Sequence, residues 1–60
     1  MRLRWNPDWN HWEAWRGSDI VALIRRDILT DMYKVTHGRD FNKSVYFNKF
    51  KEAKLCVAKL

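Results

Sequence analysis

Few side chains in this chain could carry out catalysis, and they are widely spaced. Asp27 and Asp31 are four residues apart, a spacing that places both carboxylates on one face of a helix, where a pair could bind a cation or act as acid and base. No nucleophile, glycine-rich loop or histidine cluster accompanies them, and 60 residues leave little room for a cleft. We therefore predict a non-enzymatic protein without catalytic residues, in which Asp31 lies at the margin of an apolar stripe or pairs with a lysine or arginine.

The other candidate ligands are His11, His37 and Cys56, whose spacing does not match a metal site. We predict no metal site and no cofactor. A single cysteine excludes an internal disulfide and is typical of a reducing compartment. No run approaches the ~18 apolar residues of a membrane span, and Met1–Asp8 is too polar for a signal peptide. The expected location is the cytoplasm, or the host cytoplasm for a viral protein, with no membrane partner.

Charge is distributed unevenly along the chain. Met1–Tyr33 contains five basic and five acidic residues, whereas Lys34–Leu60 contains seven basic and two acidic ones and so the whole net charge of +5. Segregated positive charge indicates an anionic partner, which could be a nucleic acid, an acidic protein or an anionic membrane face. Lysines interleaved with Tyr46, Phe47 and Phe50 resemble the mixture found on nucleic-acid surfaces, and a solvated lysine face is the simpler alternative.

Tryptophan is frequent for so short a chain. Trp5, Trp9, Trp12 and Trp15 would fall within an arc of roughly 120° on a helix. Core packing is the favoured interpretation, because each buried tryptophan removes ~200 Å² from water. The alternative is a surface that binds a protein partner or stacks on bases. Four indoles on one short helix are hard to bury completely in a monomer, so we expect a divided role.

A short strand and a short helix would position the tryptophans. Leu3 and Trp5 alternate with arginines in Met1–Trp5, which predicts a strand. Asn6 and Pro7 then predict the cap and first residue of a helix over about Pro7–Arg16, which Gly17 would end.

Two further helices are expected in the rest of the chain. A long amphipathic helix would run over about Asp19–His37 and end at Gly38. A third would begin after a cap at Asp40 or Asn42 and bury a narrow seam of Tyr46, Phe50, Ala53, Val57 and Leu60. The predicted fold is therefore mainly α, a single three-helix domain over residues 1–60 with a short N-terminal β-strand. The strand propensity of Val45-Tyr46-Phe47 is the feature that fits this prediction least.

The segment Gly38–Tyr46 resembles the ribbon-helix-helix repressors: Gly-Arg, a hydrophobic residue two positions on, Asn, then a β-branched residue and Tyr opening the second helix. Leu3-Arg4-Trp5 is similar to the end of that family's N-terminal strand. The resemblance implies a symmetric dimer whose paired strands enter the DNA major groove. It further implies that Arg4 and Arg2 contact bases, that Leu3 and Trp5 are core residues, and that Asn42 and Lys43 lie against a phosphate.

Two functions are therefore predicted. The first is a small basic nucleic-acid-binding protein, with DNA preferred, that regulates transcription as a homodimer. Its predicted contacts are Arg2, Arg4, Arg39, Asn42, Lys43, Lys51 and Lys54. The second is a protein-binding module, such as a phage-type inhibitor, an adaptor or an assembly subunit. Its predicted contacts are Trp5, Trp9, Trp12 and Trp15.

Overall fold

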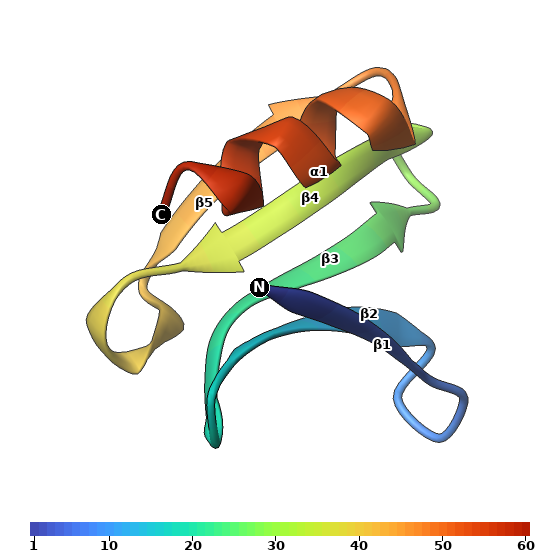
Figure 1. Cartoon of the computed structure of the whole chain (residues 1–60). Helices are drawn as coiled ribbons and strands as arrows, with labels where there is room; N and C mark the ends of the chain where they lie inside the picture. Colours follow the sequence, from blue (N-terminus) through green and yellow to red (C-terminus); the bar gives the residue numbers. More distant parts are fainter.

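The structure, a computed structural model that describes residues 1–60, is an antiparallel five-stranded sheet followed by one helix (Figure 1). Each strand pairs with its neighbour in the chain, so the sheet is a meander in the order β1-β2-β3-β4-β5. The elements are β1 Arg2–Asn6, β2 His11–Arg16, β3 Asp19–Asp27, β4 Met32–His37, the 3-10 turn η1 Arg39–Phe41, β5 Lys43–Phe47 and α1 Phe50–Ala58. Neither helical element is long and apolar enough to cross a membrane.

The prediction of a mainly α, three-helix domain is wrong, although the expected N-terminal strand is present as β1. The segment Pro7–Arg16 forms a turn and β2. Asn6 does cap this turn, since its Oδ1 accepts a hydrogen bond from the backbone N–H of Asp8 at 3.1 Å. The chain then reverses, and Trp5 pairs with Trp12 across β1 and β2, with ring centroids 5.3 Å apart. The tryptophans therefore lie on a β-hairpin and not along one face of a helix.

The expected long helix over Asp19–His37 is the hairpin of β3 and β4. Its apolar residues fit a period of two as well as a helical period, and β-branched residues favour the strand. In the strands, Ala22 and Ile24 of β3 and Val35 of β4 are fully buried on one face. The helical prediction is wrong because these apolar residues belong to two paired strands and do not form one continuous helical stripe.

Only the last part of the third predicted helix is helical. Lys43–Phe47 is the edge strand β5, in line with its strand propensity, and α1 begins at Phe50. Gly38 begins the turn before it with a φ of 87°, which favours glycine. Since Tyr46 lies in a strand, the ribbon-helix-helix fold that the resemblance implied is not the fold of this chain.

The core lies between α1 and one face of the sheet, over β4 and β5 in Figure 1. Its fully buried side chains are Ala14, Ala22, Ile24, Val35, Ala53 and Val57. Alanine in the sheet and in α1 lets the two layers approach closely. Phe50 extends the core, because its ring centroid lies 5.6 Å from that of Trp12 and 5.5 Å from that of Tyr33.

The helix leaves the other face of the sheet uncovered. Side chains alternate along a strand, so the neighbours of core residues point to this uncovered side, except at the irregularity between β2 and β3, where Val21 packs against the core beside Ala22. We call this side the open face, and from the register it carries Arg2, Arg4, Asn6, His11, Glu13, Trp15, Leu23, Arg25, Asp27, Met32, Lys34, Thr36, Ser44 and Tyr46. The β1–β2 turn, the β3–β4 turn and the β5–α1 connection lie at the same end of the strands, which we call the hairpin end (Figure 1).

Candidate nucleic-acid interface on the open face

Basic side chains from three strands lie on the open face. Arg2 and Arg4 of β1 flank Leu3, which packs against the core on the opposite face. Arg25 of β3 follows a fully buried residue and pairs in register with Lys34 of β4. Residues that are 30 positions apart in the chain therefore contribute positive charge to one surface.

A row of paired residues crosses the middle of this face from one edge of the sheet to the other. Its members, from β1 to β5, are Arg4, Glu13, Leu23, Thr36 and Ser44. A second row places Arg25, Lys34 and Tyr46 side by side on β3, β4 and β5. The uncharged side chains of the first row leave a broad central surface, with cations on both sides of it.

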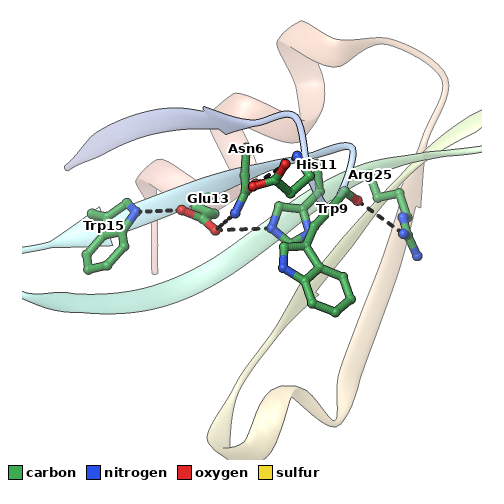
Figure 2. Close-up of polar contacts among 7 residues, drawn as sticks. Asn6, Trp9, His11, Glu13, Trp15 and Arg25 are labelled. Carbon is green, nitrogen blue, oxygen red and sulfur yellow. Dashed lines mark hydrogen bonds and ion pairs between the residues drawn. The ribbon is translucent and has the colours of Figure 1, made fainter.

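Glu13 organises the β1–β2 half of the open face, as Figure 2 shows. Its side chain is almost buried, with 8% of the residue exposed. Asn6 Nδ2 donates to Glu13 Oε2 at 2.9 Å, and His11 Nε2 lies 3.2 Å from the same oxygen. Trp15 Nε1 donates to Oε1 at 3.2 Å. One carboxylate thereby fixes three side chains, including an indole, in defined positions on the sheet.

These contacts also determine the charge of Glu13. The hydrogen bond from Asn6, followed by that from His11, lowers the pKa of Glu13 below its ordinary value of 4.5. Partial burial raises the pKa, and the smaller effect of Trp15 lowers it. The net effect is a lowered pKa, so Glu13 is ionised at neutral pH and accepts hydrogen bonds through both carboxylate oxygens.

Two aromatic side chains of the open face could stack on planar ligands. Trp15 lies beside Arg2 in the β1–β2 register, and Tyr46 lies beside Lys34 in the β4–β5 register. Tyr46 is exposed, whereas Trp15 is half-buried and is held by Glu13. An aromatic ring beside a cation is the combination with which proteins bind unstacked bases and their phosphates.

The structure brings only two of the predicted nucleic-acid contacts to this face, namely Arg2 and Arg4. The turn and edge-strand residues Arg39, Asn42 and Lys43 lie at the end of the sheet opposite the hairpin end. Lys51 and Lys54 lie on α1, which covers the other face, and the ammonium of Lys54 is 5.9 Å from the centre of the Phe50 ring. The seven predicted residues therefore belong to three separate surfaces.

The four tryptophans are also separated. Trp5 and Trp12 lie on the helix side of the sheet, where they contact each other and Trp12 also contacts Phe50. Trp9 is in the β1–β2 turn with 65% of its surface exposed, and Trp15 is on the open face. None of the four is fully buried: Trp12 packs against the core, and Trp5, which the family resemblance made a core residue, is 43% exposed, so no single tryptophan face exists.

Sequence reasoning missed Arg25, Lys34 and Tyr46 as members of one site. Their signal was the alternation of apolar and polar residues around Ile24 and Val35, which a helical interpretation hides. Asp31 was correctly expected to pair with a basic residue: it forms an ion pair with Arg26 at the exposed β3–β4 turn.

The open face carries no cluster of metal ligands. No group of three or more histidine, cysteine or acidic side chains is close enough to hold a metal ion. The chemistry available is positive charge, stacking and hydrogen bonding from fixed side chains. Comparisons with family models, with curated proteins and with solved structures found no match to this chain.

Proposed function

We propose that this protein is a non-enzymatic nucleic-acid-binding protein that uses the open face and prefers single strands. The observation that carries the proposal is the convergence of Arg2, Arg4, Arg25 and Lys34, with Trp15 and Tyr46, on the one face that the helix leaves uncovered. Cations neutralise phosphates, and exposed rings stack on bases without selecting a sequence.

The acidic residues of the open face leave this positive charge available. Glu13 accepts hydrogen bonds from three side chains, and Asp27 Oδ1 accepts the backbone N–H of Leu29 at 3.0 Å. Neither carboxylate is paired with Arg25 or Lys34 by a salt bridge. The open face can accept the splayed bases of a single strand. It fits a duplex less well, because the major groove admits a helix or a two-stranded ribbon. DNA remains the expected nucleic acid.

The test is fluorescence anisotropy of labelled random-sequence DNA, single-stranded and duplex, titrated across a series of salt concentrations. We expect tighter binding to single strands and a linear fall of log K with log salt, by about 0.7 for each phosphate contacted. The double variant Arg25→Ala with Lys34→Ala should weaken binding and reduce the salt slope by roughly 1 to 2.

A charge-matched control separates this surface from the net charge of the molecule. Lys51→Ala with Lys54→Ala removes the same two charges from α1, on the far side of the sheet. Binding should survive in this variant nearly unchanged. Equal losses in both double variants, with both folded by circular dichroism, would show that only net charge matters. Absence of binding at low salt would remove the proposal.

A second function, binding of an acidic protein partner, has its own supporting observation. Three large apolar side chains are exposed together at the hairpin end: Trp9 at 65%, Ile28 at 87% and Leu29 at 95%. Arg25 Nη2 donates to the Trp9 carbonyl at 3.2 Å and so links the β1–β2 turn, which carries Trp9, to β3, which leads into the turn that carries Ile28 and Leu29. Exposed apolar residues gathered in one place mark interaction sites more often than scattered ones do.

This alternative predicts that Ile28→Ser with Leu29→Ser abolishes capture of a partner from an extract of the source cells. The matched control is Leu55→Ser, which changes a leucine that is 56% exposed on α1. A partner that the control retains and the double variant loses would support protein binding. Retention by both variants would exclude the hairpin end as the docking surface.

A further inference from the structure

A hollow lined mainly by polar side chains lies at the hairpin end, between the β1–β2 turn and the β3–β4 hairpin. It has a volume of about 360 Å³, and its lining residues are Asn10, Arg25, Arg26, Asp27, Ile28 and Lys34. Three of the six are cations and one is an anion. The lining is therefore predominantly basic, and the hollow is large enough for a phosphate group and part of the molecule that carries it.

Two of the three cations of this hollow are held in place by neighbours. Arg25 Nη2 donates to the Trp9 carbonyl, and Arg26 donates through Nε to Asp31 Oδ1 at 3.1 Å. Each guanidinium has five N–H donors, so both retain donors for a ligand. The one acid, Asp27, already accepts a backbone N–H of its own turn through its carboxylate. The hollow therefore offers pre-positioned donors to an anion.

A second hollow lies near the hairpin end on the helix side of the sheet and is lined by aromatic rings. It has a volume of about 340 Å³, and its lining residues are Trp5, Asn10, Trp12, Ile24, Arg26 and Tyr33. Trp5 and Trp12 are in contact, and the Phe50 ring supports Trp12 and Tyr33 from α1. Asn10 and Arg26 line both hollows, so these two residues join a cationic compartment to an aromatic one.

We propose that the two hollows form one binding site for a nucleoside 5′-monophosphate unit, with the phosphate among Arg25, Arg26 and Lys34 and the base against Trp5 and Tyr33. A phosphate monoester is close to a dianion at neutral pH, and it therefore gains more from several cations than a diester inside a strand does. An aromatic wall accepts any base by stacking. The unit can be a free nucleotide or the phosphorylated first nucleotide of a strand.

This site goes beyond the open-face interface, because its aromatic half lies on the helix side of the sheet and Arg26 lines both hollows at the end of the strands. Trp5 and Tyr33 point to the helix side, and Arg26 pairs in register with Tyr33. Only Arg25 and Lys34 are common to both surfaces. The two proposals can therefore be separated by variants of the residues that are not shared.

The first experiment is calorimetric titration of the intact protein with adenosine 5′-monophosphate, adenosine and inorganic phosphate. We expect the nucleotide to bind at least tenfold more tightly than either part, because only the nucleotide occupies both hollows. Arg26→Gln changes an exposed side chain whose ion pair with Asp31 also lies at the surface, where such pairs contribute little to stability. It should weaken nucleotide binding about tenfold and bring the affinities for nucleotide and nucleoside close together.

The aromatic half is tested by Trp5→Leu, which should weaken nucleotide and nucleoside binding alike. Trp5→Phe keeps a ring and should restore most of the affinity, which separates stacking from a loss of the fold. Lys51→Gln on α1 serves as the control and should leave all three titrations unchanged. Loss of nucleotide binding in this control, or retention of full affinity in both Arg26→Gln and Trp5→Leu, would overturn the site.

Single-stranded oligonucleotides with a 5′-phosphate or a 5′-hydroxyl then distinguish the two sources of the ligand. A tenfold preference for the phosphorylated strand, lost in Arg26→Gln, supports capture of strand ends. Equal affinity for both strands, with tight nucleotide binding, supports a free nucleotide in the same site. Strand binding without any nucleotide binding or preference for the phosphorylated end overturns this site and leaves the open-face interface standing. Absence of binding to strands and nucleotide removes both proposals.

Discussion

At the scale of single residues, the carboxylate of Glu13 holds the neighbouring side chains in fixed positions. Glu13 is a nearly buried carboxylate on an otherwise exposed sheet face, and every hydrogen bond it accepts comes from a side chain. Buried charge is costly unless it is fully hydrogen-bonded, and here Asn6, His11 and Trp15 supply the donors. The contact with Trp15 also orients this indole for the proposed role in binding, so stability and function depend on one acceptor.

Glu13 should make stability depend on pH. Its pKa is lowered in the folded protein, so the unfolded chain binds more protons over the window just below its ordinary pKa of 4.5. Stability is therefore present above this window and is lost as pH falls through it. We expect the melting temperature to drop between about pH 5 and pH 3, and Glu13→Gln, which does not titrate, to show a smaller drop. Parallel curves for the two proteins would contradict this assignment.

Gly17 should be required for its backbone conformation alone. It occupies the two-residue β2–β3 turn with a φ of 62°, and a methyl group at its Cα would meet no atom within 4 Å. Gly17→Ala should therefore cost about 1 kcal/mol through backbone strain, without a steric clash. Urea denaturation monitored by circular dichroism measures this. An unchanged midpoint would show that the turn adopts another conformation.

At the scale of elements, the packing of α1 on the sheet provides most of the core. Val57 is 2% exposed and contacts the buried cluster, whereas Leu55, two residues earlier, is 56% exposed. Both are aliphatic residues of the same short helix, so a comparison of their substitutions separates the effect of burial from that of helix propensity. A nine-residue helix is not stable alone in water, and its formation depends on this packing.

Val57→Ala should cost about 2 kcal/mol, because two buried carbon atoms are removed and a cavity remains. Leu55→Ala should change stability by less than about 0.5 kcal/mol, as is usual for an exposed position. Thermal and urea denaturation of the two variants test the pair. Equal effects would mean that α1 presents a different face to the sheet.

At the scale of the whole molecule, the fold distributes charge over several surfaces. The open face, the hairpin end and the outer side of α1 each carry cations, and both edge strands carry basic residues: Arg2 and Arg4 on β1 and Lys43 on β5. Charged edges discourage strand-to-strand pairing between molecules. A net charge of +5 on a chain with a radius of gyration of 10.6 Å adds general repulsion.

We therefore expect a monomer at low ionic strength, with self-association favoured only when salt screens these charges. Sedimentation velocity at about 20 mM and about 500 mM salt measures this, since the Debye length shrinks several-fold between the two. A stable dimer at low salt would contradict the expectation and would support the homodimer that the family resemblance implied.

The sequence by itself determined the punctuation and the chemical inventory of this protein. Asn6, Gly17 and Gly38 were expected at the boundaries of elements and do lie there, although the elements they bound are strands and turns and not helices, and β1 was expected from the alternation of Leu3 and Trp5 with arginines. Turns depend on a few local residues, so their positions can be recognised without knowing which strands pair.

Only the tertiary structure decided between helix and strand and so decided which residues share a surface. The segment Asp19–His37 has apolar residues that satisfy either period, and pairing with β2 and β5 selects the strand. That selection places Arg25 beside Lys34, separates Trp15 from Trp12, and moves Lys51 and Lys54 to another layer. Strand pairing joins residues distant in sequence, and no local pattern encodes which strands will meet.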